Sequence, residues 1–198
     1  RLDSSIMKTI IITGGTSGIG LNLANFFYKK KCNIAIVGLL TELKIKNLKK
    51  KFNAKRSLIL NLDLIKDDNT KRFVELTKKK FKKVDILINC AGLQHVAPIC
   101  NFSDKIWNYI ININLTIPFK MIKEVLPIMR KNKWGRIINI SSAYSFLSRE
   151  GRSVYSSTKA GMDALTRSLA VEFSKENILT NSVAPGFVNT ELTKQNNT

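Results

Sequence analysis

The sequence predicts an α/β fold, a doubly wound parallel sheet with helices on both of its faces. Short apolar runs rich in β-branched residues alternate with longer amphipathic or basic stretches along the chain, and this alternation is typical of parallel strands joined by covering helices. A glycine-rich turn separates the first run from the first amphipathic stretch. With 198 residues, 44% of them hydrophobic, the chain is long enough for one globular domain, which we expect to span residues 1–198.

The apolar runs and the stretches between them define the expected elements. Predicted strands cover residues 8–13, 33–37, 57–62, 84–88, 136–140 and 179–183. Predicted helices cover residues 21–31, 44–55, 69–81, 103–129 and 156–174. Nothing in the sequence suggests a linker, a low-complexity block or a second domain.

The turn after the first strand reads GGTSGIG from Gly14 to Gly20. Glycines let the backbone turn sharply and approach a pyrophosphate, and the following helix offers free N–H groups and the positive end of its dipole. A plain glycine-rich turn with nothing bound is the alternative. Because a strand precedes the turn and a helix follows it, the motif favours nucleotide binding in a Rossmann-like fold.

The second strand ends at Gly38-Leu39-Leu40, where dinucleotide folds usually recognise the ribose. An acid there would bind the ribose hydroxyls of NAD, and a basic residue the 2′-phosphate of NADP. The absence of an arginine favours NAD as the cofactor. Lys44 or Lys46 could fold back toward the ribose, so NADP stays open as the alternative.

Two further strand ends carry candidate cofactor contacts. Asp63 follows the third strand, where its carboxylate could accept a hydrogen bond from an adenine amino group or cap the next helix. The fourth strand runs into Asn89-Cys90-Ala91-Gly92. Small residues there would let the end of the strand lie against a cofactor.

Tyr155, Lys159 and Ser142 are the candidate catalytic residues. Tyr155 and Lys159 are four residues apart, so a helix would place both on one face, where an ammonium would lower the pKa of the phenol. Ser142 follows the fifth strand, at the carboxyl edge where open α/β sheets bind ligands. For the Tyr-Lys pair alone, an exposed helix face with a half-packed tyrosine is the alternative.

The net charge of +19 raises the question of a nucleic-acid partner. The lysines at 49–51 and 78–83 could bind an anionic surface, or they could be solvated faces of helices. Because the lysines are dispersed and no nucleic-acid motif accompanies them, we expect no nucleic-acid partner.

The remaining composition argues against metal, disulfide and membrane functions. Cys32, Cys90 and Cys100 match no zinc spacing and cannot all pair, so we expect free thiols. His95 is the only histidine, and we expect it to pack in a loop and not to bind a metal. No apolar run approaches the roughly eighteen residues that span a bilayer, and the start lacks the features of a secretory signal. We therefore expect a cytoplasmic protein with no membrane partner.

Taken together, these residues resemble the classical branch of the short-chain dehydrogenase/reductase family. The matching motifs are Thr13-Gly14-x-x-x-Gly18-x-Gly20, Asn89-x-Ala91-Gly92, Asn114, Ser142, Tyr155-x-x-x-Lys159, Asn181, and Pro185-Gly186 followed by Thr190. They cover nearly the whole chain in the order and spacing of the family. The resemblance implies an NAD(P)-dependent enzyme that interconverts a secondary alcohol and a ketone.

The resemblance also implies a role for each catalytic residue. Tyr155 would be the general acid and base, and Ser142 would polarise the substrate carbonyl. Lys159 would hold the nicotinamide ribose and lower the pKa of the tyrosine, while Asn114 would organise a water in the proton relay. The implied cofactor-binding residues are Gly14, Thr16, Ser17, Gly18, Ile19, Gly20, Asp63, Leu64, Asn89, Ala91, Gly92, Tyr155, Lys159, Pro185, Gly186, Val188 and Thr190.

A narrower resemblance concerns the substrate. The loop GLQHVAPI that starts at Gly92 is similar to the corresponding loop of bacterial D-3-hydroxybutyrate dehydrogenases, in which a glutamine, a histidine and a lysine hold the substrate carboxylate. Gln94 matches the glutamine, whereas Tyr144 and Arg152 stand at the other two positions. A hydroxyl and a guanidinium can also bind a carboxylate. The implied substrate-binding residues are Gln94, Ser142, Tyr144, Arg152 and Tyr155.

Several functions follow as alternatives. The first is a dehydrogenase of a small hydroxy acid or ketone, with 3-hydroxybutyrate and acetoacetate as the specific expectation. The second is a 3-oxoacyl thioester reductase of fatty-acid synthesis, since a basic surface would suit an acidic carrier protein. A dehydrogenase of a sugar or other small alcohol is third. A non-catalytic nucleotide-sensing or scaffold protein is disfavoured by the complete set of Ser142, Tyr155 and Lys159.

The resemblance finally bears on assembly and on the end of the chain. Relatives form homo-oligomers, usually tetramers, and continue through a segment that covers the substrate and a last strand that helps to build the tetramer. Because this sequence ends at Thr198, we expect it to be incomplete at its C-terminus and the full protein to be a homotetramer.

Overall fold

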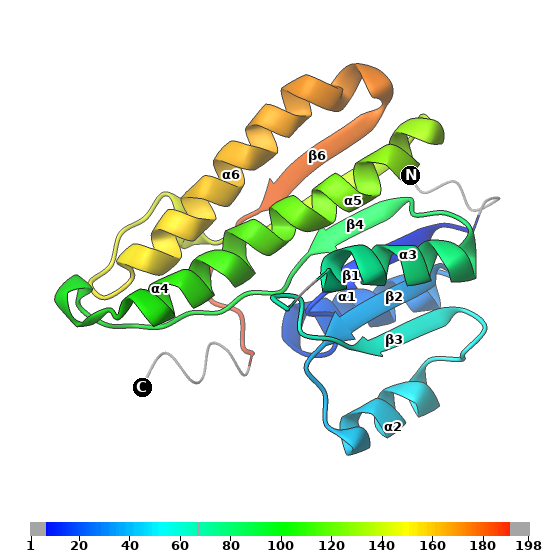
Figure 1. Ribbon diagram of the computed structural model, residues 1–198, viewed down its shortest axis with the longest axis horizontal. Helices are drawn as coiled ribbons and strands as arrows, with labels where there is room; N and C mark the ends of the chain where they lie inside the picture. The colour runs from blue at the N-terminus through cyan, green and yellow to red at the C-terminus, as the bar shows by residue number, and fades with distance from the viewer. Residues whose placement is uncertain (1–6, 67, 191–198) are drawn as a thin grey trace.

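The computed structural model of the protein describes residues 7–66 and 68–190. Its six strands form one parallel sheet in the order β3-β2-β1-β4-β5-β6 (Figure 1). The strands are β1 (Thr9–Thr13), β2 (Asn33–Gly38), β3 (Ser57–Asn61), β4 (Ile86–Asn89), β5 (Gly135–Ile140) and β6 (Ile178–Val183). Each lies within two residues of its predicted position. The predicted fold class is confirmed.

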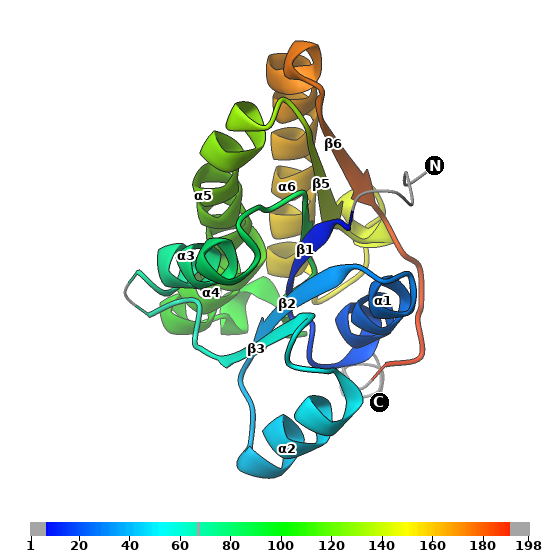
Figure 2. The same cartoon turned by 90° about the vertical axis from the view of Figure 1, so that its right-hand side faces the viewer.

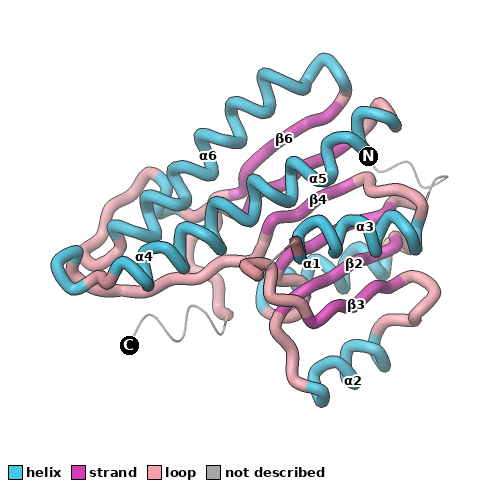
Figure 3. Tube along the Cα trace, in the orientation of Figure 1, coloured by secondary structure: helices cyan, strands magenta, loops and turns pink. Residues whose placement is uncertain are grey.

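The helices alternate with the strands along the chain (Figure 3). They are α1 (Gly18–Lys29), α2 (Glu42–Lys51), α3 (Asn69–Phe81), α4 (Asp104–Ile111), α5 (Ile117–Lys131) and α6 (Ser153–Phe173). The single helix predicted over residues 103–129 is wrong in one respect, because a π-helical turn, Asn112–Thr116, separates α4 from α5. Such turns carry no apolar period of their own, so the hydrophobic pattern gives no sign of them.

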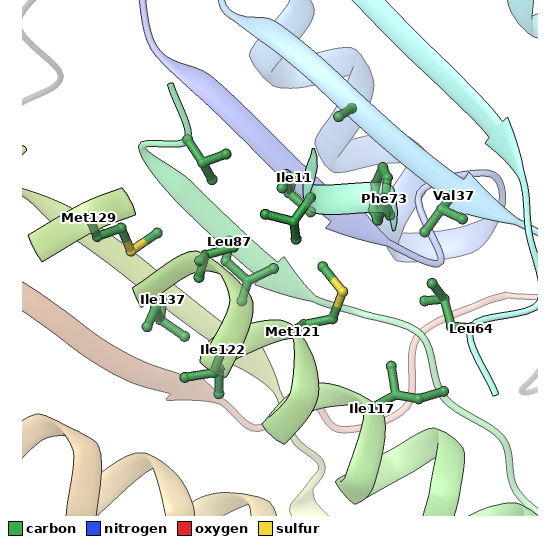
Figure 4. Packing of buried hydrophobic residues seen from close by; sticks show 14 of the residues in the cluster. Ile11, Val37, Leu64, Phe73, Leu87, Ile117, Met121, Ile122, Met129 and Ile137 are labelled. Carbon is green, nitrogen blue, oxygen red and sulfur yellow. The ribbon is translucent and has the colours of Figure 1, made fainter. Parts of the chain in front are cut away.

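Two hydrophobic cores lie on opposite faces of the sheet. Figure 2 shows α1 and α2 on one face and α3, α5 and α6 on the other. Alternate residues of β1 serve the two cores, because successive side chains of a strand point to opposite faces. Ile10 and Ile12 pack with Phe27 of α1 and Phe52 after α2. Ile11, Val37, Leu87 and Ile137 pack with Phe73 of α3 and with Ile117, Met121 and Met129 of α5 (Figure 4).

The order of the strands places a crevice at one edge of the sheet. From β1 the chain passes to β2 and β3, then returns to pair β4 with the other side of β1. Connections after β1 and β4 therefore diverge to opposite faces at the carboxyl ends of these strands, and open α/β sheets bind ligands at this point. None of the helices within residues 7–66 and 68–190 is long and apolar enough to cross a membrane.

A buried carboxylate fixes the opposite edge of the same two strands. Asp85, just before β4, is 6% exposed and accepts a hydrogen bond of 2.7 Å from the backbone N–H of Thr9. The ammonium groups of Lys8 and Lys83 lie 3.8 and 3.4 Å from its oxygens. The start of β1 is thus held to the start of β4 by charge as well as by the ladder.

Candidate active site

A cavity lies at the carboxyl edge of the sheet and is lined by residues at and after the carboxyl ends of β1, β4, β5 and β6. Its lining consists of Gly14, Ser17, Gly18, Ile19, Gly20, Cys90, Ala91, Gly92, Gln94, Ile140, Ser141, Tyr144, Arg152, Tyr155, Lys159, Pro185, Gly186, Phe187, Val188 and Thr190. The glycine-rich turn forms one wall and the start of α6 another. The divergence of the chain after β1 and β4 explains why the cavity is here.

The glycine-rich turn packs directly on the segment after β4. Gly14 has a φ of +64°, which favours glycine, and a Cβ at this position would lie 2.8 Å from the Cα of Ala91. Thr13 completes the contact, because its hydroxyl oxygen accepts hydrogen bonds from the backbone N–H groups of Cys90 (3.0 Å) and Ala91 (3.1 Å). The turn therefore packs against the end of β4, and the N-terminus of α1 faces the cavity.

The turn has the features that a dinucleotide requires. Gly20 is packed so closely that a Cβ would lie 2.3 Å from the carbonyl oxygen of Gly14, which keeps the first turn of α1 against the sheet. Ser17 is the N-cap residue of α1, and its hydroxyl makes no capping hydrogen bond. Backbone N–H groups at a helix N-terminus and a dipole of the right sign suit a pyrophosphate. These residues fit the group that the sequence motif implies.

Ser142 and Tyr155 are in contact beside the cavity. Ser142 follows β5 and is 7% exposed, and Tyr155, in the first turn of α6, is 9% exposed. Their side chains are hydrogen-bonded to each other, and Ser142 Oγ also accepts a 3.2 Å hydrogen bond from the backbone N–H of Tyr144. The serine hydroxyl is thus held against the phenol, which itself lines the cavity.

The pKa of Tyr155 is raised above its ordinary value in this environment. Burial is the main cause, because it disfavours the phenolate. The hydrogen bond from Ser142 and the positive charge of Arg152 act in the opposite direction and lower the pKa, while Tyr144 raises it. The spacing of Tyr155 and Lys159 predicts a lowered pKa; in the structure burial outweighs the groups that favour ionisation.

Lys159 lies one turn below Tyr155 and is 3% exposed. Its Nζ donates a 2.8 Å hydrogen bond to the carbonyl oxygen of Ile140 and lies 5.6 Å from the centre of the Tyr155 ring. Burial lowers the pKa of Lys159 to about 8, while Cys90 and Asp163 act to raise it. The ammonium is therefore anchored at the end of β5, with one donor committed to the backbone.

The candidate substrate residues surround the same hydroxyl groups. Gln94, Tyr144 and Arg152 all line the cavity. The ring centres of Tyr144 and Tyr155 lie 6.4 Å apart in an edge-to-face arrangement, and the guanidinium carbon of Arg152 lies 5.2 Å from the centre of the Tyr144 ring. Arg152 is 3% exposed, so a positive charge is buried beside the phenol.

Comparison with known proteins identifies the family. The model of a family described as short chain dehydrogenase matches residues 8–198.

The chain belongs to the short-chain dehydrogenase family.

Two curated relatives and one solved structure show how close the likeness is. The chain is 35% identical over 191 residues to the D-beta-hydroxybutyrate dehydrogenase of Rhizobium meliloti, covering 95% of this chain and 74% of that protein. It is also 35% identical over 191 residues to a 3-oxoacyl-acyl-carrier-protein reductase of Buchnera aphidicola, covering 96% and 77%. A short-chain dehydrogenase from Streptomyces avermitilis superposes with a TM-score of 0.89 at 26% identity, covering 96% and 69%.

Membership of this family makes the chain an oxidoreductase that acts on CH–OH groups and uses NAD or NADP. The two curated relatives are equally similar to the chain and differ in substrate. The substrate of this short-chain dehydrogenase therefore depends on its own residues.

Six of the residues implied for the short-chain dehydrogenase site do not line the cavity. Ser142 lies behind Tyr155. Thr16 is 5% exposed and packs against Gly38. Asp63 closes a local turn by accepting a 3.1 Å hydrogen bond from the backbone N–H of Ile65. Leu64 is buried in the core below α3 and α5.

The other two are asparagines buried in hydrogen-bond networks. Asn89 donates through Nδ2 to Asn139 Oδ1 at 2.8 Å, which ties β4 to β5. Asn114, in the π-helical turn, is 0% exposed. Its Oδ1 accepts from the N–H of Leu93 at 2.8 Å, and its Nδ2 donates to the carbonyl of Leu93 at 2.8 Å and to Thr158 Oγ1 at 3.1 Å.

Ile140, Ser141 and Phe187 line the cavity and were not predicted by the sequence motifs. Ile140 and Ser141 lie directly before Ser142, so proximity in the sequence was an available signal. Phe187 is 70% exposed and lies between the predicted residues Gly186 and Val188, so the same signal was available for it. Cys90 also lines the cavity; burial raises the pKa of its thiol to about 11, so the thiol stays protonated at neutral pH.

Proposed function

We propose that this short-chain dehydrogenase interconverts 3-hydroxybutyrate and acetoacetate, with NAD as the cofactor. The observation that carries the proposal is the shared cavity of Tyr155, Gln94 and Arg152. A side-chain amide and a buried guanidinium beside the phenol suit a substrate whose carboxylate is close to its reacting carbonyl. The likeness to a protein named D-beta-hydroxybutyrate dehydrogenase supports it.

Tyr155 is the proposed general acid and base. In reduction its hydroxyl gives a proton to the carbonyl oxygen as the carbonyl carbon receives hydride, and in oxidation the phenolate takes the proton from the alcohol. The nicotinamide, when bound, supplies or accepts the hydride. Ser142 donates a hydrogen bond to the same oxygen and polarises the carbonyl. Its contact with Tyr155 supports the proposal that the two hydroxyl groups act together.

Lys159 and Asn114 support this pair in different ways. Lys159 presents its remaining N–H donors toward the cavity that it lines, where they would hold a ribose hydroxyl. Asn114 acts through its contacts with Leu93, because its side-chain amide is occupied by Leu93 and Thr158. We propose that the Asn114 side chain holds the segment 92–94. A water in the proton relay would then bind the backbone carbonyl of Asn114.

The preference for NAD is proposed from the end of β2, where Gly38-Leu39-Leu40 offers no arginine to a 2′-phosphate. A Cβ at Gly38 would lie 2.3 Å from Thr16 Oγ1, so neither a basic nor an acidic side chain fits at this position while Thr16 keeps its place. Lys44 is half-buried and lines a second cavity with Thr16, Ser17 and Gly18. An ammonium at this point is the one specific observation in favour of NADP.

Binding titrations of NAD and NADP separate the two cofactors. We expect NAD to bind more tightly and Lys44→Gln to leave its dissociation constant unchanged. Tighter binding of NADP, weakened by Lys44→Gln, would show that Lys44 recognises the 2′-phosphate and that NADP is the cofactor. Lys46→Gln is the matched control, because Lys46 faces another hollow with Lys49 and Lys50.

A second candidate is a 3-oxoacyl thioester reductase. Phe187 lines the cavity and is 70% exposed, and Phe146 and Leu147, in the loop before α6, are 72% and 53% exposed. An exposed apolar ring in the cavity lining would suit an acyl chain. The net charge of +19 would attract an acidic carrier protein, and the likeness to a protein named 3-oxoacyl-acyl-carrier-protein reductase supports this reading.

Oxidation of NADH and of NADPH, followed by absorbance with acetoacetate or a short 3-oxoacyl thioester, tests both candidates. The proposal requires turnover of NADH with free acetoacetate. It also requires Gln94→Ala and Arg152→Gln to raise the KM for acetoacetate by about tenfold or more, while Arg149→Gln, three residues away and exposed, leaves it unchanged. Turnover of the thioester alone would make the chain a fatty-acid reductase and overturn the proposal.

The proposed assembly is a homotetramer. Trp107 and Tyr109 of α4 are 42% and 44% exposed, and Phe119 of α5 is 51% exposed. Exposed aromatic side chains on successive helices suit contact with a second copy. Sedimentation velocity measures the assembly directly, and a monomer at micromolar concentration would contradict it.

A further inference from the structure

Two threonines of α6 make the same pair of hydrogen bonds, one to a backbone carbonyl of the helix and one from the amide of a buried asparagine. Thr158 donates to the carbonyl of Tyr155 at 2.7 Å and accepts from Asn114 Nδ2 at 3.1 Å. Thr166 donates to the carbonyl of Met162 at 2.8 Å and accepts from Asn139 Nδ2 at 2.8 Å. Thr158 is 0% exposed and Thr166 5%. Only the first pair leads to the substrate side of the cavity.

The Thr158 hydroxyl fixes the orientation of the Asn114 amide. A threonine hydroxyl has one proton, and Thr158 uses it on the carbonyl of Tyr155. It can therefore only accept from its neighbour, and the Asn114 amide must turn Nδ2 toward it. This orientation leaves Oδ1 for the N–H of Leu93 and the second Nδ2 proton for the carbonyl of Leu93.

The Asn114 amide in turn holds the segment that carries Gln94. Its two bonds to Leu93, each of 2.8 Å, satisfy both backbone groups of a residue in an otherwise irregular stretch. A Cβ at Gly92 would lie 3.5 Å from Asn114 Oδ1 and 3.7 Å from Lys159 Nζ. The segment 92–94 thus lies against the catalytic helix and in contact with Asn114.

A small residue allows the helix to come this close. A Cβ at Gly161 of α6 would lie 3.2 Å from Leu115 Cδ2, in the π-helical turn. A side chain larger than glycine at this position would have to displace the end of the Leu115 side chain, so glycine suits the close packing of α6 on the π-helical turn. The packing of Gly161 on Leu115 and the hydrogen bond from Asn114 to Thr158 therefore both join α6 to the π-helical turn.

We propose that Thr158 is a positioning residue that couples the substrate segment 92–94 to the helix of Tyr155, through the orientation of the Asn114 amide. The effect on substrate affinity rests on the proposed function, in which Gln94 contacts the substrate. The coupling itself is independent of which substrate is bound.

Hydrogen exchange and kinetics of four proteins test the proposal: the native chain, Thr158→Val, Thr158→Ser and Thr166→Val. Valine keeps the volume and removes the hydroxyl, and serine restores it. We expect Thr158→Val to speed exchange of the Leu93 amide by about tenfold or more and to raise the KM for the oxo substrate by about tenfold. The dissociation constant of the nucleotide should change by less than about twofold, and Thr158→Ser should restore native values.

Thr166→Val is the matched control, because it removes the same two kinds of hydrogen bond from the same helix. Equal effects of the two valine variants on the Leu93 amide and on KM would overturn the proposal. If Thr158→Val does not fold, exchange in the native chain decides: a Leu93 amide that exchanges as fast as exposed loop amides would also overturn it. A native chain that turns over neither oxo substrate would refute the proposed function alone, since the exchange measurement needs no substrate.

Discussion

The ammonium of Lys159 donates a hydrogen bond of 2.8 Å to the carbonyl oxygen of Ile140. Lys159 and Tyr155 are one helical turn apart in α6, so this bond joins the helix of Tyr155 to the end of β5. The end of β5 therefore carries the charge of Lys159 before any ligand binds. This contact keeps a buried amine in place, although burial outweighs the groups that favour its charge and lowers its pKa to about 8. Catalytic geometry at this point is set by the sheet as much as by the helix.

The buried Lys159 should make stability depend on pH. Its pKa falls from 10.5 to about 8 on folding, so the unfolded chain holds this proton more strongly. The group therefore destabilises the fold below pH 8, and this penalty disappears as pH rises from 8 to 10.5. Urea unfolding should show the native chain gaining up to about 3 kcal/mol relative to Lys159→Met over this range. Parallel curves for the two proteins would contradict the shifted pKa.

Tyr155→Phe should abolish turnover and preserve nucleotide binding. The substitution removes the proton-transferring hydroxyl and keeps the ring, so kcat should fall by about 10²–10⁴-fold, with the dissociation constant of the cofactor unchanged in a fluorescence titration. Tyr144→Phe is the control, since this ring lies beside Tyr155 without the proposed proton transfer. Activity that survives Tyr155→Phe would exclude the role proposed for this hydroxyl.

Ser142→Ala should displace the pH profile of alcohol oxidation. The hydrogen bond from Ser142 lowers the pKa of Tyr155, which burial raises. Its loss should raise the pKa of Tyr155 further, move the acidic limb of kcat/KM for oxidation to higher pH and reduce kcat. Ser141→Ala is the control, because Ser141 lines the cavity and its hydroxyl contacts the carbonyl of Lys159 at 3.5 Å. If the limb stays at the same pH in Ser142→Ala, Ser142 does not influence the pKa of Tyr155.

Gly20→Ala should disrupt the turn that faces the cavity. A Cβ at this position would lie 2.3 Å from a backbone oxygen of Gly14, so the backbone must shift, at a cost of about 1–3 kcal/mol in the free energy of unfolding. Nucleotide binding should weaken as well. Gly186→Ala provides a comparison for stability, because its Cβ would meet nothing within 4 Å. Equal stability of the two variants in urea would show that the turn relaxes without strain.

Asp85→Asn should cost more stability than Glu176→Gln. Asp85 is 6% exposed and faces two lysines and a backbone N–H, so we expect a loss of about 2 kcal/mol. Glu176 pairs with Arg130 at 2.8 Å, but these side chains are 36% and 58% exposed, and such pairs contribute about 1 kcal/mol or less. Urea unfolding at neutral pH compares them, and the reverse order would contradict this account.

The strands were predictable because most are short apolar runs, and β1, β2 and β4 are buried along nearly their whole length. Residues 33–37 and 136–140, for example, lie within β2 and β5. The predicted helix 69–81 coincides with α3. Helix α6 begins at Ser153, three residues before the predicted start, and its first turn buries Val154 and Tyr155. The ends of an element are marked less clearly than its interior by the hydrophobic pattern.

Much of the site was predictable because its motifs lie next to strand ends, as with Gly14 after β1 and Ala91 after β4. What the sequence could not predict depends on three-dimensional contacts. The π-helical turn at Asn114 is fixed by Leu93 and Thr158, which are distant in the sequence. The direction in which the pKa of Tyr155 is shifted depends on burial. The spacing of four residues between Tyr155 and Lys159 carries no information about burial.

The cavity described above joins Gly14 to Thr190, and nearly all of the described chain lies between them. A partly folded intermediate that has formed only β1, β2 and β3 would contain the glycine-rich turn but neither Tyr155 nor Lys159. Contacts of such large sequence separation form slowly. During refolding, the ability to bind nucleotide should therefore return only with the last cooperative step. The rate at which binding is regained would then measure the rate of that step.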